Sequence, residues 1–160
     1  MKITKDILRK LIKEEVKSLL TEATRSQIGI ELPNGKVVAV YCHWDGYPEH
    51  VGKILKKHYK NAQKIKDLLK VGKHGISALR KDVGKKHDFD APYKEIEKLG
   101  YTTFYGRDRN EKSNMSHQYK NREEYGKKGR SKFGTEYHYV FSLKDKKWSY
   151  YDYNGKEKIL

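Results

Sequence analysis

Residues 27–43 read QIGIELPNGKVVAVYCH, and this stretch decides the fold. Apolar and polar residues alternate over Gln27–Leu32, which is the period of a half-buried β-strand. Pro33-Asn34-Gly35 follows, and then the β-rich run Lys36–His43. Asn-Gly between two such runs is the strongest short-range signal for a β-hairpin. The sequence therefore predicts two antiparallel strands joined by a tight turn.

The residues after this hairpin predict helices before any further strand. Pro48 at the first helical position and Glu49 in the first turn begin a helix that runs to about residue 59. A second helix is expected over 62–71 and a third over 92–99, each followed by a glycine. Residues 72–91 are expected to be loop, with a short turn at 77–80.

Three further strands are expected at 101–105, 136–143 and 147–153, the last two as a hairpin. Residues 106–132 are polar with little periodicity, so we expect a long loop that is functional or disordered. The prediction is an α+β fold, an antiparallel sheet of about five strands with two or three helices inserted between strands two and three. Residues 23–160 are expected to form this single domain.

Residues 1–22 predict an amphipathic helix that is separate from the strand pattern. Apolar side chains recur at helical spacing in MKITKDILRKLIKEEVKSLLTE, and the remaining face mixes Lys, Arg and Glu. Charges interrupt any secretory core, and Glu14 and Glu15 share the polar face, which argues against a membrane anchor. The chain has no stretch of about 18 apolar residues. We expect no membrane partner.

A strongly basic balance points to a polyanionic partner. The chain has 36 Lys and Arg against 21 Asp and Glu, a formal charge of +15. Two blocks, 53–86 and 106–132, hold most of the excess. The alternative is that these lysines only solvate the surface. We expect nucleic acid or a phosphate-bearing small molecule to contact Lys53, Lys57, Lys60, Lys64, Lys127, Lys128 and Arg130.

The densest polar cluster is residues 41–50, YCHWDGYPEH, where a strand ends and a helix begins. Backbone N–H groups at a helix start attract anions. The structural alternative has Asp45 capping the turn, Gly46 supplying a positive φ and Trp44 in the core. The candidate ligand-binding residues here are His43, Trp44, Asp45, Tyr47 and His50.

A second candidate, Gly106-Arg107-Asp108-Arg109, follows the third strand. Two guanidinium groups flanking a carboxylate suit phosphate, with Asp108 orienting one of them. The alternative is a surface salt bridge. If the strands before the two motifs are parallel neighbours, or join the same sheet edge, Arg107 and Arg109 converge with His43 and Asp45 on one phosphate site. Aromatic residues among the nearby basic ones suit base stacking or plain packing: Tyr119, Tyr125 and Phe133.

Catalytic and metal chemistry have little support. Cys42 is the single cysteine, which excludes a disulfide framework and a Cys-rich zinc module. Its neighbour His43 points to the opposite face of a strand and cannot act as its base, so an inert buried thiol is expected. No HExxH or CxxC spacing occurs. We expect no cofactor or metal, assign no catalytic residue and leave enzymatic activity open.

The N-terminal segment resembles the capsid-targeting peptides found on proteins of large tailed phages. Such peptides are removed by a prohead protease that cuts after Leu/Ile-x-Glu, and Leu20-Thr21-Glu22 followed by Ala23 matches that rule. The resemblance implies cleavage after Glu22 and contact with the phage capsid or its protease through residues 1–22.

A second resemblance covers most of the remaining chain. Thr24-Arg25-Ser26, the run from Val40 to Tyr59 and Tyr105–Arg109 are similar to a family of small phage and prophage proteins with no established activity. The resemblance implies a phage accessory protein and transfers no catalytic residue.

Together these patterns predict a phage accessory protein that binds a phosphate-bearing polyanion. It would be packaged in the virion and delivered to the host cytoplasm for host takeover or counter-defence. One alternative is a sponge or hydrolase for a nucleotide immune signal, in which a pocket joins residues 45–50 to 107–109. The other is a structural virion protein docked by its N-terminal helix.

Overall fold

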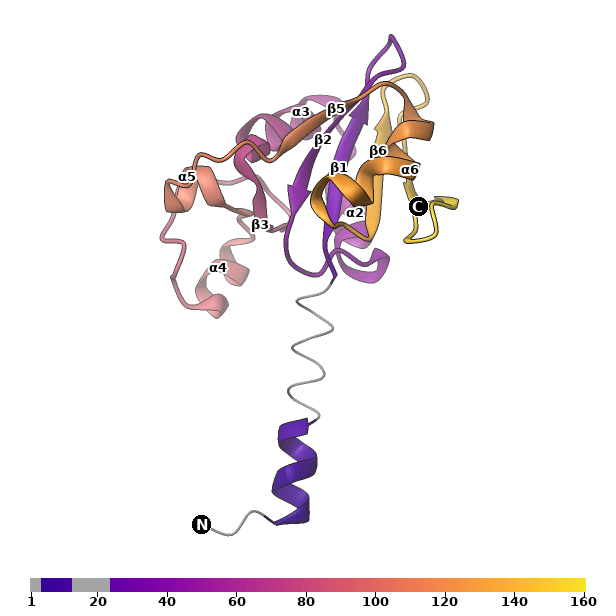
Figure 1. Cartoon of the computed structure of the whole chain (residues 1–160). Coiled ribbons are helices and arrows are strands. Elements are labelled where there is room, and N and C mark those ends of the chain that lie inside the picture. Colours follow the sequence, from indigo (N-terminus) through magenta and orange to yellow (C-terminus); the bar gives the residue numbers. More distant parts are fainter. Residues whose placement is uncertain (1–3, 13–23) are drawn as a thin grey trace.

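The computed structural model describes residues 4–12 and 24–160, and its centre is a mixed, mostly antiparallel sheet (Figure 1). The strand order is β4-β3-β2-β1-β6-β7-β8, and β5 also pairs with β2. The strands of the described residues are β1 Ser26–Glu31, β2 Val37–Cys42, β3 Ile76–Ala78, β4 Thr103–Phe104, β5 Ser116–Tyr119, β6 Tyr137–Ser142, β7 Lys147–Tyr151 and β8 Glu157–Ile159.

The predicted hairpin is confirmed as the pair β1 and β2, antiparallel with Ile28 opposite Val40. Gly35 takes a φ of 86° in the turn, which a residue without a side chain adopts at no steric cost. The second predicted hairpin is also confirmed, as β6 and β7. Two pairings differ from the antiparallel expectation, since β1 pairs with β6 and β2 with β3 in parallel.

Helices between β2 and β3 cover one face of the sheet, as the sequence predicts. They are η1 Pro48–Gly52, α2 Lys53–His58, α3 Ala62–Val71 and the short η2 Gly72–His74. Asn61 begins α3 by accepting hydrogen bonds from the backbone N–H groups of Gln63 and Lys64. Their apolar faces meet the sheet in the main core, which includes Val51, Leu55, Ile65, Leu68, Ile28, Tyr139 and Phe141.

Helix α6, Arg122–Phe133, covers the other face, so the expectation of a loop over 106–132 is wrong (Figure 1). That stretch also contains α5 Tyr105–Arg109 and strand β5. Asn121 begins α6 with a bond to the N–H of Glu124. The helix shows almost no apolar period, because Gly126 and Gly129 occupy buried positions of its inner face. Glycine there lets the helix approach Tyr151 and His138 closely.

A buried polar network lies between α6 and the sheet. The Gln27 amide donates to the carbonyl of Gly129 at 2.8 Å and to the Thr135 hydroxyl at 3.0 Å, and it accepts from Tyr119 at 2.8 Å. His138 Nε2 lies 2.8 Å from the Thr135 hydroxyl. Tyr119 and Tyr125 are at most 2% exposed, so they pack rather than offer rings for base stacking.

The segment after η2 is more ordered than the predicted loop. It contains β3, and α4 Tyr93–Leu99 follows, ending at Gly100 with a φ of 71° as expected. With β3, β5 and β8 added, the described chain has eight strands where about five were expected.

Residues 5–12 form a helix, and its exposed apolar side chains are Ile7, Leu8, Leu11 and Ile12. The rest of the predicted N-terminal helix lies outside the described residues, as do the cleavage residues Leu20, Glu22 and Ala23. Among the described residues, no helix has the length and apolar character needed to cross a bilayer.

Candidate anion-binding groove

The N–H donors of Arg107 bond acceptors within the protein. Its Nε and Nη2 donate to the two carboxylate oxygens of Asp108 at 2.9 and 3.2 Å. The other donors bond backbone carbonyls, Nη2 to Thr102 at 2.8 Å and Nη1 to Val83 and Gly84 at 2.9 and 3.1 Å. These bonds engage all five N–H donors of a guanidinium. We therefore assign Arg107 a structural role in place of the expected phosphate contact.

The rest of the GRDR motif is also used internally. Asp108 is buried and accepts from the backbone N–H groups of Phe104 at 2.8 Å and His87 at 3.1 Å. Arg109 pairs with Glu111 at 3.0 Å and lies over the ring of Phe89. The strands before the two motifs are not parallel neighbours, because β3 lies between β2 and β4, and β4 runs antiparallel to β2. The motifs still approach each other, since the ring centroids of His43 and Tyr105 lie 6.3 Å apart, but the donors of Arg107 are used within the protein.

The first half of the 41–50 cluster forms the corner that follows β2. His43 Nδ1 lies 2.7 Å from the hydroxyl of Tyr41, and the ring of Trp44 meets the His43 ring edge-on. Asp45, rather than Gly46, adopts the positive φ, at 53°. Gly46 is needed for space, because a Cβ there would lie 2.7 Å from the Cβ of Ser26.

Two remaining members of that cluster differ in role. Tyr47 precedes η1 and its ring contacts that of His50, while His50 itself lines a groove. Cys42 is fully buried, and burial raises the pKa of its thiol to about 12, which leaves it protonated and inert as expected.

The groove runs between the η1–α2 segment and the chain that leaves β3. Two adjoining hollows of about 270 and 240 Å³ share the side chains of His50, Ile54, His58 and Glu97. The first hollow adds Glu49, Lys53 and Lys57, and the second adds Leu79, Arg80, Lys81 and Gly100. We call this the basic groove and use that name for these residues throughout.

Cations outnumber carboxylates in the basic groove. Lys53, Lys57 and Lys81 are exposed and Arg80 is the fourth cation, against Glu49 and Glu97. Partial burial and the ammonium groups of Lys57 and Lys64 lower the pKa of His58. An uncharged imidazole can accept one hydrogen bond and donate one, and it does not repel the neighbouring lysines.

Arg80 is the feature that the sequence analysis missed. Its side chain is only 10% exposed; Nε donates to Glu97 at 3.1 Å, and Nη1 donates to the Tyr101 carbonyl at 3.0 Å and the Thr103 hydroxyl at 2.8 Å. Nη2 makes no hydrogen bond to any described residue. A nine-tenths buried side chain that lines the basic groove therefore keeps two N–H donors without a hydrogen bond to the described residues.

Some of the lysines expected to bind a polyanion are exposed, and one is hydrogen-bonded within the protein. Lys53 and Lys57 line the basic groove, and Lys60 is exposed beyond α2. Lys64 is occupied, because its ammonium donates to the carbonyls of His58 and Lys81 at 2.8 and 2.7 Å and lies 3.2 Å from the Asp82 carboxylate. Three acceptors use all the donors of one ammonium.

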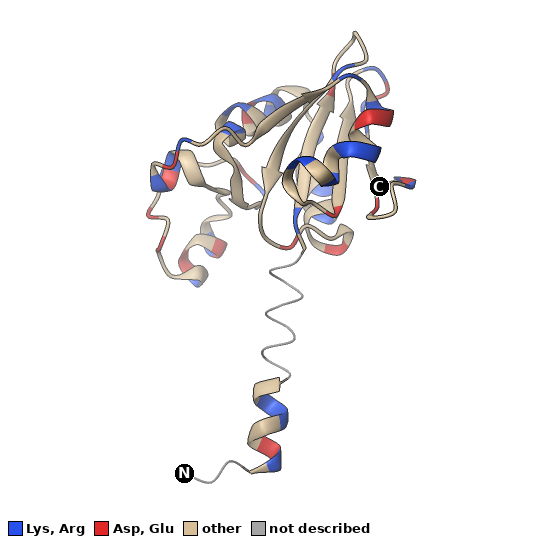
Figure 2. Cartoon of the chain, viewed as in Figure 1, with Lys and Arg blue, Asp and Glu red and all other residues tan. Residues whose placement is uncertain are grey.

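The basic residues of α6 form a separate surface. Lys127 and Lys128 lie 2.7 and 4.0 Å from Glu123 and Glu124 one turn earlier, and Arg130 is exposed. Figure 2 shows Lys and Arg on several elements, α3 and α6 among them, so the charge alone selects no face. Another hollow, of about 330 Å³, has the cations Arg122 and Lys147 balanced by Asp145 and Glu157. The basic groove is distinguished by its excess of cations and by Arg80.

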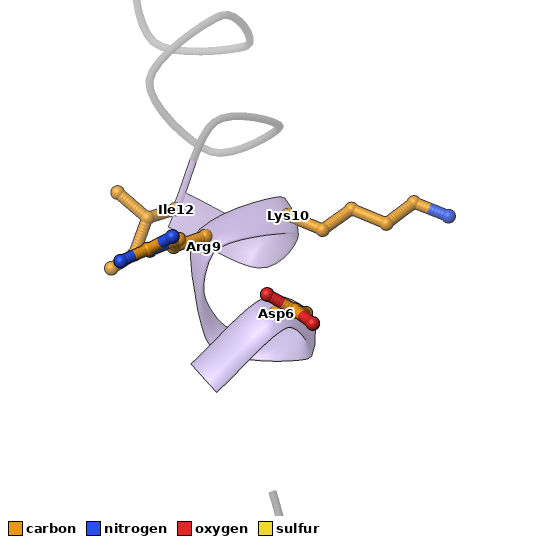
Figure 3. A pocket seen from close by; sticks show the side chains of 4 residues that line it. All are labelled: Asp6, Arg9, Lys10 and Ile12. Carbon is orange, nitrogen blue, oxygen red and sulfur yellow. The ribbon is translucent and has the colours of Figure 1, made fainter. Parts of the chain in front are cut away.

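A further hollow is lined, among the described residues, by the N-terminal helix. Asp6, Arg9, Lys10 and Ile12 line it, and Figure 3 shows that these side chains come from one helix and that Lys10 points away from Arg9 and Ile12. One short helix provides a single wall, so we build no site on it.

Comparison with family models, with curated proteins and with solved structures found no match. Among the described residues, no group of three or more His, Cys, Asp or Glu side chains is placed to hold a metal ion. The case for function therefore rests on the geometry of the basic groove.

Proposed function

We propose that the protein binds a phosphate-bearing polyanion in the basic groove. The observation that carries the proposal is Arg80, whose side chain is 10% exposed while its Nη2 makes no hydrogen bond within the described chain. A guanidinium fixed by three other hydrogen bonds presents its remaining donors in a set direction, and such donors suit phosphate oxygens.

The neighbouring lysines extend this contact into a track for a chain of phosphates. Lys53 and Lys57 are one helical turn apart on one wall of the groove, and Lys81 follows Arg80 on the other wall. Glu97 opposes phosphate binding by its charge, yet it also holds Arg80 Nε in place. The formal charge of +15 draws polyanions toward the whole molecule and raises the rate of encounter.

The expected biological setting follows from the resemblance to phage proteins. A protein packaged beside DNA and delivered to the host cytoplasm meets nucleic acid at high concentration, where phosphate contacts release counterions. The nucleotide sponge or hydrolase remains an alternative, but the internal bonds of Arg107 disfavour the pocket on which that alternative depends.

A salt titration tests the proposed site. We compare binding of a labelled oligothymidylate to the native protein, to the triple variant K53Q/K57Q/K81Q and to the control K112Q/K120Q/K144Q. The control lysines are exposed and lie outside the groove, and both variants lose three charges. If each groove lysine contacts one phosphate, the slope of log K against log salt falls by about 2 for a single strand.

The control variant decides how this result is interpreted. A weaker effect in K112Q/K120Q/K144Q than in the groove variant supports a defined site. Equal losses in both variants mean that net charge alone drives binding, and no detectable binding by the native protein at low salt overturns the proposal.

A further inference from the structure

Tyr93 stands exposed beside the basic groove. Tyr93 is the first residue of α4 and is 66% exposed. Four other tyrosines are at most 2% exposed: Tyr59, Tyr119, Tyr125 and Tyr139. An aromatic ring left in water forgoes the burial that stabilises the others. Packing in the core therefore gives no reason for an aromatic residue at this position.

The ring is tied to the groove through Arg80. The guanidinium carbon of Arg80 lies 5.7 Å from the centroid of the Tyr93 ring, and Glu97, one turn along α4, bonds Arg80. Arg80 thus contacts the Tyr93 ring, bonds its acceptors within the protein and lines the groove. A phosphate on Nη2 and a base on the ring would lie within the reach of one nucleotide.

The charges around Tyr93 suit a base better than a phosphate. Partial burial and the nearby carboxylates of Glu97 and Asp45 raise the pKa of Tyr93. Asp45 and Glu97 repel phosphate from the ring, and Lys53, Lys57 and Lys81 attract it to the groove, where Glu97 also opposes it. Four cations against two carboxylates still favour phosphate in the groove, which leaves the exposed ring for an uncharged base.

We infer that the basic groove takes single-stranded nucleic acid, with an unpaired base stacked on Tyr93 and its phosphate at Arg80. This inference rests on the proposed function and adds the substrate class. Bases in a duplex are stacked on each other and cannot use the ring, whereas every unpaired base has a face that an aromatic side chain can cover. Single strands are consequently preferred over duplexes of the same length.

The test compares three probes and three variants. The probes are oligothymidylate, a duplex of equal length and inorganic polyphosphate, which carries phosphates but no base. The variants are Y93A, the conservative Y93F and the control Y153A, whose ring is 56% exposed and contacts Tyr137 rather than a groove residue. Thermal unfolding of each variant confirms that it is folded at the assay temperature.

The expected result is a loss confined to one probe. Y93A binds oligothymidylate roughly tenfold more weakly, in line with the loss of one base stack. Y93F and Y153A bind oligothymidylate as the native protein does, and all three variants bind polyphosphate with native affinity.

Each failure has a separate meaning. If polyphosphate binds normally but Y93A leaves oligothymidylate affinity unchanged, the stacking inference is wrong and the proposed polyanion site stands. If Y93A weakens polyphosphate equally, the ring only supports Arg80, and the inference is again wrong. If the native protein binds neither probe, the proposed function itself fails.

Discussion

Arg107 and Arg109 show how differently two arginines of one short motif are used. Arg107 donates to Asp108 and to three backbone carbonyls, and its side chain is 16% exposed. Arg109 is 52% exposed and pairs with one exposed glutamate. The sequence predicts guanidinium groups here but cannot predict that the carbonyls of Val83 and Gly84 will reach one of them.

Replacing Arg107 should therefore affect stability rather than binding. In R107M the buried Asp108 loses its guanidinium partner, and we expect the free energy of unfolding to fall by roughly 3 kcal/mol. The matched change R109M should move it by less than about 0.5 kcal/mol. Urea unfolding measures the free energy change of each variant. Equal and small changes would show that Arg107 has no structural role and is available to a ligand.

His138 makes stability depend on pH. Burial, with a smaller effect from Arg130, lowers its pKa to about 4, below the value near 6.5 of an exposed histidine. Between these values the unfolded chain binds the proton and the folded chain does not. The contribution of His138 is thus intact above pH 6.5 and is lost as the pH falls toward 4.

We expect this loss to be on the order of 3 kcal/mol. Unfolding curves at pH 7, 5.5 and 4.5 measure it, with H138Q as the comparison because an amide does not titrate. A native protein and an H138Q variant that lose stability in parallel over this range would contradict the assignment.

At the scale of elements, the hairpins and the helices that cover the main core follow from local patterns. Pro48 and Gly100 mark helix ends by their own conformational preferences, so the helices around them are predictable. Helix α6 is not, because Gly126 and Gly129 replace the apolar residues of its inner face. Its position depends on contacts with Tyr151 and His138, which only the tertiary structure supplies.

Substitution of Gly126 tests this account of α6. Alanine normally stabilises a helix interior by about 1 kcal/mol relative to glycine. In G126A, however, the new Cβ would lie 2.5 Å from the Tyr151 ring, so we expect a net destabilisation of about 1–3 kcal/mol. The exposed neighbour Ser131 provides the control, since S131A should be neutral or slightly stabilising. Stabilisation by G126A would show that α6 does not pack as described.

The two walls of the basic groove come from different elements. His50, Lys53 and Lys57 belong to one continuous helical segment, and the sequence placed them together. The opposite wall comes from Arg80, Lys81 and Glu97, which reach the groove through β3 and α4. No local pattern relates these residues to the first wall, and that is why Arg80 and Tyr93 were missed.

At the scale of the whole molecule, the formal charge is +15, and Lys and Arg of the described residues lie on several elements (Figure 2). A uniform excess predicts attraction to any polyanion, but the basic groove predicts one preferred path across the surface. For residues 1–22 we propose packaging in the virion rather than ligand binding.

Processing is a whole-chain prediction that follows from the resemblance to capsid-targeting peptides. Protein taken from mature phage particles should begin at Ala23, which leaves 138 of the 160 residues. Peptide mass mapping of purified particles detects the new N-terminus. Intact Met1 in mature capsids would contradict cleavage and favour the helix as a retained docking element.

The central claim is that binding takes place in the basic groove, and mapping of amide chemical shifts tests it most directly. Uniformly ¹⁵N-labelled protein is titrated with oligothymidylate at low salt. The account predicts the largest shift changes in residues 49–58, 79–81 and 97–100, with Lys127, Lys128 and Arg130 of α6 little affected. Changes centred on α6, or spread evenly over all basic segments, would contradict it.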